Sequence, residues 1–243
     1  MTYCVGLMLK RGLVFMSDTR TNAGLDNVST FSKMFTWSDD GDSTITIMTA
    51  GNLATTQSVV SMIDERTKAP SERSPSILGL PSMFQVARFV GATLRDVIDR
   101  QSQTGQRADS TFNATIIVGG QVKGSPPRLF LIYPEGNFIE AGLDTPFLQI
   151  GEIKYGRPIL VRAFDPDMSF EAAVKLLLVS FDSTIKANLS VGLPLDLEIY
   201  ETGSFTRGLH RRITREDAYF QTISAGWGNA LKRAFDSLPD LTL

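Results

Sequence analysis

The order of strands and helices constrains the fold of this sequence more than any other feature. Extended sequence rich in β-branched and aromatic residues comes first, in four segments: 2–9, 13–18, 32–37 and 44–51. Apolar residues at three- and four-residue steps then predict two amphipathic helices, from Asn52 to about Lys68 and from about Ser82 to Ile98. Residues 21–30 are rich in Gly, Asn and Ser and are expected to form a loop.

The second half repeats this order of elements with a different sequence. Strands are predicted at 112–120, 128–134 and 196–202, and helices after Gly151, from Ser169 to Asn188, and through Ala225, Leu231 and Phe235. Strands followed by helices, twice, predict an α+β fold in which two antiparallel sheets lie face to face with helices outside, a four-layer αββα sandwich. No composition shift follows the short segment at 71–82, so residues 1–243 are expected to form a single domain.

The scarce residue types exclude several kinds of site. A single cysteine, Cys4, excludes an intrachain disulfide, and a single histidine, His210, excludes a multi-histidine metal site. The sequence has no glycine-rich phosphate-binding motif, and its net charge of −2 provides no basic field for nucleic acid. We therefore expect no metal, no cofactor and no nucleic-acid partner.

The apolar segments argue against export and membrane insertion. In the apolar opening of the sequence, the charges of Lys10 and Arg11 follow the apolar run, the reverse of their order in a signal peptide. The longest later apolar run, around 176–181, is far shorter than the roughly 20 residues of a membrane-spanning helix. A cytoplasmic protein without membrane contact is expected, and the single cysteine fits a reducing compartment.

Catalysis through histidine is disfavoured by the surroundings of His210. It lies in the segment RGLHRRITRED, where three arginines would favour its neutral form, and we interpret it as a surface histidine in a basic loop. The carboxylates are scattered, so their spacing selects no glycosidase-like pair.

The N-terminus offers a nucleophile that needs no histidine. Thr2 is small enough for a methionine aminopeptidase to remove Met1, which would leave Thr2 with a free α-amine. An α-amine has an ordinary pKa of about 7.7–8.0 and can accept the proton of the threonine hydroxyl near neutral pH. Base and nucleophile would then belong to one residue.

Three later residues fit the same chemistry. Asp18 ends the second strand and Lys33 follows in the next strand-like segment, so the two can meet beneath the start of the first strand. A lysine there would lower the pKa of the amine and hydroxyl, and an aspartate would hold that lysine charged and oriented. Gly51 lies where a strand turns into a helix, and its backbone N–H could face an oxyanion.

The motifs that contain these residues resemble a known family. The segments TYCVG, SDTRTNAG, SKMF and TAGNLATTQ are similar to the proteasome β-subunit and HslV group of N-terminal nucleophile hydrolases. The longer segments TYCVGLML, SDTRTNAGLDNVSTFSKM and IGEIKYGRPIL more closely resemble the bacterial proteasome-like subfamily Anbu. The resemblance covers essentially the whole chain and implies the αββα fold.

The resemblance also implies roles for individual residues. Thr2 resembles the family nucleophile, Asp18 and Lys33 its charge pair, and Gly51 its oxyanion donor. Four further positions are implied in substrate binding: Arg20, Thr21 and Asn22 along the substrate backbone, and Thr49 in the first specificity pocket. A small polar Thr49 implies no sharp preference.

Two departures from the family pattern lie next to the nucleophile. The family's glycine-serine-glycine turn is replaced by Gly151, Glu152 and Ile153, which brings a carboxylate close to the amine. The family's aspartate-x-x-serine-glycine aligns with Ala187 or Asn188 and then Ser190, so the aspartate is missing. Glu152, Asn188 and Ser190 are therefore candidates for residues that support the nucleophile.

The leading hypothesis is a proteasome-like threonine peptidase that cleaves amide bonds in peptides or unfolded proteins. One alternative is a weakly active or non-catalytic subunit that self-assembles. Another is an amidase or acyltransferase that acts on a small-molecule or isopeptide amide. The resemblance implies a homo-oligomer, either a ring or a helical assembly, and delivery of folded substrates would need a separate ATPase.

Overall fold

Two five-stranded sheets form the centre of the molecule. The computed structural model describes residues 2–22, 28–72, 74–102 and 112–242. One sheet has the order β10-β1-β2-β11-β12: Phe147–Gly151, Tyr3–Leu9, Gly12–Asp18, Leu195–Glu201 and Leu209–Ile213. The other has the order β5-β6-β7-β8-β9: Met34–Asp39, Ser43–Gly51, Ala114–Val122, Arg128–Ile132 and Phe138–Glu140. Every pair of neighbouring strands is antiparallel.

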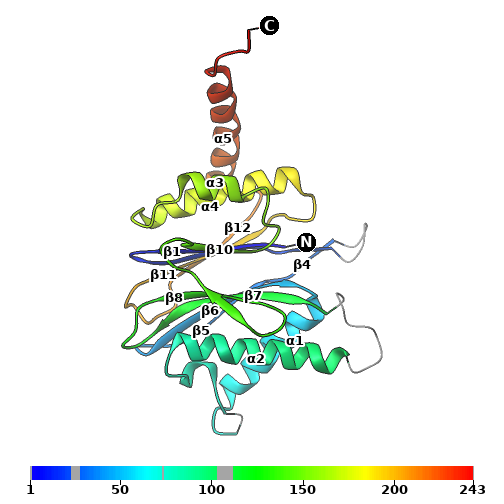
Figure 1. Cartoon of the computed structure of the whole chain (residues 1–243), viewed down its shortest axis with the longest axis vertical. Helices are drawn as coiled ribbons and strands as arrows, with labels where there is room; N and C mark the ends of the chain where they lie inside the picture. Colours follow the sequence, from blue (N-terminus) through cyan, green and yellow to red (C-terminus); the bar gives the residue numbers. More distant parts are fainter. Residues whose placement is uncertain (1, 23–27, 73, 103–111, 243) are drawn as a thin grey trace.

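Helices cover the outer face of each sheet (Figure 1). The helices α1 (Leu53–Lys68) and α2 (Met83–Ser102) pack on the β5–β9 sheet, with a short 3₁₀ turn before α2. The helices α3 (Arg157–Ala163) and α4 (Phe170–Ala187) cover the other sheet, and α5 (Ala218–Asp236) continues beyond them. The arrangement confirms the predicted four-layer αββα sandwich.

Local capping explains where three of the helices begin. The side chain of Asn52 accepts a hydrogen bond from the N–H of Thr55 at the start of α1. Ser169 caps α4 and Asp217 caps α5 in the same way. These short polar side chains satisfy N–H groups that have no partner inside the helix, so each helix starts where its sequence provides a cap.

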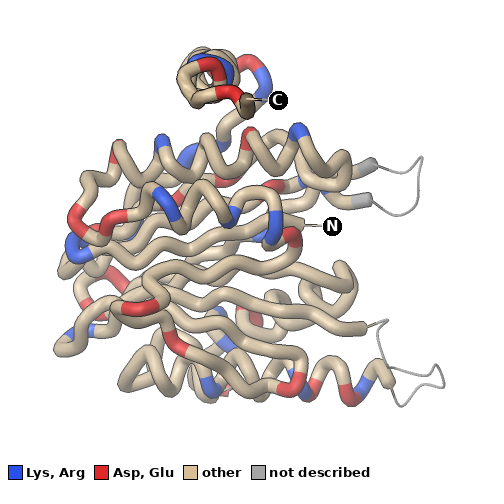
Figure 2. The backbone as a smooth tube through the Cα atoms, turned by 45° about the horizontal axis from the view of Figure 1, so that its top comes forward, with Lys and Arg blue, Asp and Glu red and all other residues tan. Residues whose placement is uncertain are grey.

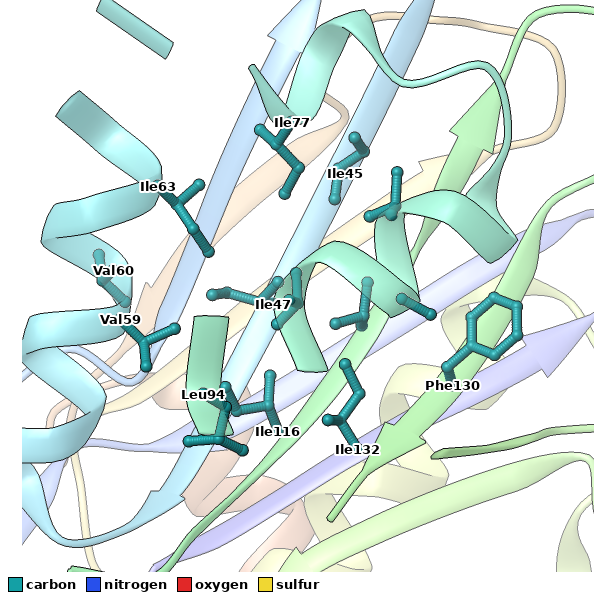
Figure 3. Packing of buried hydrophobic residues seen from close by; sticks show 14 of the residues in the cluster. Ile45, Ile47, Val59, Val60, Ile63, Ile77, Leu94, Ile116, Phe130 and Ile132 are labelled. Atoms are coloured by element: carbon teal, nitrogen blue, oxygen red, sulfur yellow. The ribbon is translucent and has the colours of Figure 1, made fainter. Parts of the chain in front are cut away.

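Three apolar clusters hold the layers together. Side chains of β6 alternate, so that Ile45 and Ile47 face α1 and α2 while Met48 and Ala50 face the opposite sheet. Figure 3 shows the helix side of this packing, where Ile63 and Leu94 meet the isoleucines of the sheet. A second cluster lies between the other sheet and α3 and α4, and a third fills the space between the sheets.

The structure corrects the sequence expectations in three places. The expected loop at 21–30 contains strands β3 (Arg20–Asn22) and β4 (Val28–Thr30), which pair with each other, while residues 23–27 lie outside the described residues. His210 lies in β12, not in a loop, and pairs with Glu198 of β11. The strands β9 and β10 were not expected. All these strands are short, and they form through main-chain pairing with partners that no local pattern reveals.

Tyr3 fixes the position of the first strand directly after Thr2. Its ring is fully buried against Phe181 of α4, with 4.4 Å between ring centroids. Its hydroxyl accepts a hydrogen bond from Gln149 and bonds to Ser180, at 2.8 Å each. Burial raises the pKa of Tyr3 to about 12, so this hydroxyl remains protonated. The N-terminal strand is therefore tied to both β10 and α4.

None of the helices in the described part of the chain has the length and hydropathy needed to cross a membrane.

We predict that Tyr3→Phe lowers the free energy of unfolding by about 1–3 kcal/mol, because buried polar groups of Gln149 and Ser180 lose a partner. Urea unfolding followed by far-UV circular dichroism measures this change. Tyr219→Phe, at a half-exposed position on α5, is the matched control and should leave stability unchanged. Equal effects of both substitutions would contradict an anchoring role for the Tyr3 hydroxyl.

Candidate active site

A buried ion pair lies beneath the N-terminal strand. Lys33 precedes β5, and its Nζ lies 2.8 Å from Oδ1 of Asp18, the last residue of β2. The two side chains are 6% and 0% exposed. Nζ of Lys33 also donates to the carbonyl of Arg20 at 2.6 Å. The predicted meeting of Asp18 and Lys33 is therefore present.

Asp18 also binds main-chain groups from two other parts of the chain. Its Oδ1 accepts the N–H of Tyr3 at 2.9 Å, and its Oδ2 accepts the N–H of Gly192 at 3.4 Å. Burial raises the pKa of Asp18 above its usual range, while the Lys33 ammonium and the two N–H groups oppose this rise. The carboxylate thereby ties the residue next to Thr2 to the loop between α4 and β11.

Thr2 is held between β1 and the end of β10. Its carbonyl accepts the N–H of Glu152 at 2.6 Å, and only 9% of the residue is exposed. Gly151 has φ +83°, and a Cβ at this position would collide with the carbonyl of Thr2. Glycine is therefore required beside the candidate nucleophile.

At the end of β6, the main-chain N–H of Gly51 points to the side of the strand that faces away from β7. Thr49 donates its N–H to the carbonyl of Lys33 at 2.9 Å, so the N–H of Gly51, two residues later, faces the same side. In the described part of the chain no strand pairs with Gly51 on that side. On the other side, Asn52 donates its N–H to the carbonyl of Asn113 at 3.0 Å. Because successive N–H groups of a strand alternate in direction, the N–H of Gly51 points away from β7. Gly51 has φ +115°, and a Cβ there would collide with the carbonyl of Asn113.

These groups converge on one pocket of about 220 Å³. Six of the lining residues carry the argument here: Thr2, Thr21, Lys33, Thr49, Gly51 and Gly151. The hydroxyl of Thr21 is buried and has no hydrogen-bond partner among the described residues. Five of the site residues expected from the sequence therefore line one small pocket, with Asp18 behind Lys33.

In the described part of the chain, no strand pairs with the side of β3 that faces away from β4, beside this pocket. Phe31 donates its N–H to the carbonyl of Thr19, so the alternation along β3 directs the main-chain groups of Thr21 toward β4. The main-chain groups of Arg20 and Asn22 point away from β4, and the carbonyl of Arg20 meets Lys33 there. An extended chain could pair with this edge.

The side chain of Arg20 is turned toward the loop after α4. Its guanidinium donates to the carbonyl of Leu189 at 2.8 Å, so it braces the loop that contains Gly192. The side chain of Asn22 lies outside the described residues.

The three supporting candidates form one hydrogen-bonded chain. Glu152 is buried, and its Oε2 accepts Nδ2 of Asn188 at 2.9 Å. Oδ1 of Asn188 accepts the N–H of Ser190 at 2.9 Å, and Oε1 of Glu152 accepts the N–H of Lys154 at 2.9 Å. The network links the residue bonded to the Thr2 carbonyl with the end of α4.

A second carboxylate that the sequence analysis missed positions the residue before Lys33. Ser32 donates its hydroxyl to Asp196 of β11 at 3.1 Å. The guanidinium of Arg212 in β12 donates two hydrogen bonds to the same carboxylate, at 2.7 and 3.0 Å. The sequence signal for this role is that Asp196 and Glu198 alternate with apolar residues in a strand. In the structure both acidic side chains are buried on the face between the sheets.

Comparisons with known proteins identify the family of this chain. No family model matches the sequence. The solved structure of Anbu, the ancestral β-subunit, from Yersinia bercovieri is 46% identical, and the match covers 99% of this chain and 100% of that one, with a TM-score of 0.92. The chain belongs to the Anbu family.

Two further relatives place Anbu among proteasome-like proteins. The helical assembly of the Anbu complex from Pseudomonas aeruginosa is 45% identical, with 99% of this chain and 98% of that one covered and a TM-score of 0.92. Proteasome subunit beta 2 of Pyrobaculum neutrophilum is 24% identical over 205 residues, 82% of this chain and 88% of its own length. The sandwich of this Anbu chain is thus a proteasome-like N-terminal nucleophile hydrolase fold.

His210 and the carboxylates near it form no metal centre. Nδ1 of His210 lies 3.6 Å from Oε2 of Glu198. Glu198 is buried and accepts the hydroxyls of Thr36 and Thr46 at 2.7 and 2.8 Å. Within residues 2–22, 28–72, 74–102 and 112–242 no cluster of three or more His, Cys, Asp or Glu could hold a metal ion.

We predict that Lys33→Met lowers the free energy of unfolding by about 3–5 kcal/mol near neutral pH, because the Asp18 carboxylate remains buried without its cation. The double variant Lys33→Met with Asp18→Asn should recover most of this loss. Chemical unfolding of the two variants beside wild type measures both effects.

The loss in Lys33→Met should shrink as the pH falls. Lys33 lowers the pKa of Asp18, which burial raises, so removal of Lys33 raises the folded-state pKa further. When the pKa of a carboxyl is higher in the folded than in the unfolded chain, its ionisation above the unfolded-state pKa lowers the stability of the fold. As the pH falls through the folded-state pKa, the carboxyl becomes protonated and this loss of stability disappears. A deficit that is independent of pH would contradict a buried, charged Asp18.

Proposed function

We propose that this Anbu chain is a threonine-type hydrolase that cleaves amide bonds in peptides or unfolded proteins, with Thr2 as the nucleophile after removal of Met1. The observation that carries the proposal is the shared pocket. It brings together Thr2, Lys33 with Asp18 behind it, and Gly51, whose N–H pairs with no strand in the described part of the chain. These are a nucleophile, a buried cation and an oxyanion donor.

The chemistry follows from these positions. The free α-amine of Thr2 accepts the hydroxyl proton while Oγ attacks the substrate carbonyl, and the Lys33 ammonium stabilises the developing negative charge. The oxyanion of the tetrahedral intermediate accepts the N–H of Gly51. The ammonium of Thr2 then protonates the leaving amine, which leaves an ester between Thr2 and the acyl group. Water, deprotonated by the same amine, hydrolyses this ester and regenerates Thr2.

The walls of the pocket indicate how a peptide would bind. The outward N–H of Arg20 and the outward main-chain groups of Asn22 can pair with an extended substrate, as an added strand does, while the carbonyl of Arg20 binds Lys33. Thr49 and Thr21 line the pocket with small hydroxyl side chains and leave no sharp selection by charge or size.

Self-assembly is part of the same proposal. A relative with 45% identity is described as a helical assembly, and we infer that copies of this chain also associate into a ring or helix. Such an assembly would restrict the site to unfolded chains, and a separate ATPase would be needed to deliver folded ones.

We predict that purified active protein begins at Thr2, that Thr2→Ala is inactive and that Thr2→Ser retains activity. Serine keeps the hydroxyl and the amine, whereas alanine keeps only the amine. A peptide epoxyketone should react with both groups of Thr2 and form one ring adduct. Intact mass spectrometry and hydrolysis of a fluorogenic peptide library measure these outcomes. Quantitative retention of Met1 on active protein would refute the mechanism.

We also predict that Glu152 moves the activity toward alkaline pH. A protonated amine cannot act as base, so kcat/KM should rise as the pH passes the amine pKa, ordinarily about 7.7–8.0. The Glu152 carboxylate favours the ammonium and raises this pKa, while the Lys33 ammonium opposes it. Glu152→Gln should therefore shift the rise to lower pH by roughly one unit.

The pH–rate profile of Glu152→Gln is compared with that of Glu140→Gln, a surface carboxylate paired with Arg128 far along the other sheet. The control should reproduce the wild-type profile. A shift of the Glu152→Gln profile to higher pH would contradict the assigned electrostatic effect.

A further inference from the structure

A second pocket adjoins the candidate active site. It has a volume of about 510 Å³ and shares Ala50, Gly51 and Gly151 with the pocket that contains Thr2. Gly51 provides the proposed oxyanion donor, and Gly151 lies against the carbonyl of Thr2. The two pockets therefore meet beside the proposed nucleophile and oxyanion donor.

The walls of the second pocket are mostly apolar. Apart from the shared residues, six members of the lining matter here: Thr115, Leu131, Tyr133, Pro134, Ile150 and Ile153. We call this pocket the side pocket. Ile150 of β10 belongs to the apolar cluster between the sheets, and Leu131 of β8 packs against that cluster. None of the described residues that line the side pocket is an Asp, Glu, Lys, Arg or His. It therefore suits an apolar group better than a charged one.

The proposed reaction needs a place for each half of the amide substrate. Thr21 and Thr49, which are expected beside the acyl half, line the first pocket only. When Thr2 attacks the carbonyl carbon and the oxygen binds the N–H of Gly51, the leaving amine and the acyl half occupy different positions on a tetrahedral carbon. The side pocket begins at Gly51 and Gly151 and does not include the acyl-side residues. The residue that contains the leaving amine is therefore its occupant.

Ile153 gives the side pocket a wall that glycine could not provide. It stands where the family's glycine-serine-glycine turn has its second glycine. Its side chain is 46% exposed, so a ligand that covers it removes apolar surface from water. Ile153 directly follows Glu152, whose N–H binds the carbonyl of Thr2 at 2.6 Å. The side chain is thus held at a fixed place relative to the nucleophile.

We propose that the side pocket binds the residue that follows the scissile bond and selects an apolar side chain there, with Ile153 as the specificity-determining residue. The proposal rests on the function proposed above, because it takes Thr2 as the nucleophile. It adds a substrate class, namely peptides with an apolar residue directly after the cleaved bond. An aspartate or lysine at that position would leave water for an apolar site and is disfavoured.

Two internally quenched peptides that differ only in leucine or glycine directly after the scissile bond test this selection. Wild type should cleave the leucine peptide with a kcat/KM at least about tenfold higher, because an apolar pocket discriminates between side chains of different size to about this extent. A third peptide with aspartate at that position should be cleaved more slowly than the leucine peptide. Equal kcat/KM for the leucine and glycine peptides would overturn the proposal and leave hydrolysis by Thr2 intact.

Substitution of Ile153 tests its assigned role. Ile153→Ala should lower the ratio of kcat/KM between the leucine and glycine peptides by about fivefold, whereas Ile153→Val should keep most of it. Val161→Ala, at an exposed apolar position on α3 outside the side pocket, is the matched control and should keep the wild-type ratio.

A peptide epoxyketone separates selection from support of the site. This probe has no residue on the amine side, so it should form its adduct with Thr2 at the wild-type rate in Ile153→Ala. A fall in this rate that matches the fall in hydrolysis of both peptides would show that Ile153 only supports the fold of the site. That result, or an unchanged leucine-to-glycine ratio, would overturn its role in selection.

Photocrosslinking tests the occupant without any hydrolysis. Thr2→Ala lacks the nucleophile and should bind an alanine-rich peptide whose only large apolar side chain is a central p-benzoylphenylalanine. After irradiation, mass spectrometry should map the crosslink to Leu131, Tyr133 or Ile153. Crosslinks confined to the first pocket, or no crosslink at saturating peptide, would overturn the proposal. If wild type cleaves no peptide, the proposed function fails, and the crosslink map still decides whether the side pocket binds an apolar residue.

Discussion

The buried pair of Lys33 and Asp18 is the interaction on which the arrangement of the site depends. Asp18 accepts hydrogen bonds from Lys33, from the main chain next to Thr2 and from the loop after α4, three segments far apart in the sequence. A buried ion pair loses much of its attraction to desolvation and is weak support for a fold by itself. The pair matters for position, because the Asp18 carboxylate binds the first residue of β1, the Lys33 ammonium and the loop after α4.

The pocket exists because strands end there. β5 begins one residue after Lys33, so in the described part of the chain the N–H of Gly51 has no partner strand on that side. β10 ends at Gly151, where only glycine allows the carbonyl of Thr2 to approach. Among the described residues, antiparallel pairing thus leaves the N–H of Gly51 without a partner strand at the end of β6. In the proposed mechanism this N–H binds the oxyanion.

The candidate site lies at the ends of the strands, between the sheets, and the helices lie outside them. Figure 2 shows Lys, Arg, Asp and Glu along these outer helices and the distal end of α5.

The sequence alone determined the layers and much of the site. Segments rich in β-branched and aromatic residues identified most strands, and apolar residues at three- and four-residue steps identified the main helices. Thr2, Asp18, Lys33 and Gly51 were named from local motifs and family resemblance. They lie where strands begin or end, and such positions are recognisable from short segments.

Only the tertiary structure decided which distant segments support that site. Asp196 reaches Ser32 because β11 lies beside β2 in one sheet and opposite β5 in the sandwich, a register that no local pattern specifies. His210 belongs to a strand because its main chain pairs with β11, although its side-chain pattern resembles a loop. Glu152, Asn188 and Ser190 became one network only when β10 met the end of α4. Hydrophobic periodicity acts within each element, whereas these contacts depend on how separate elements pack together.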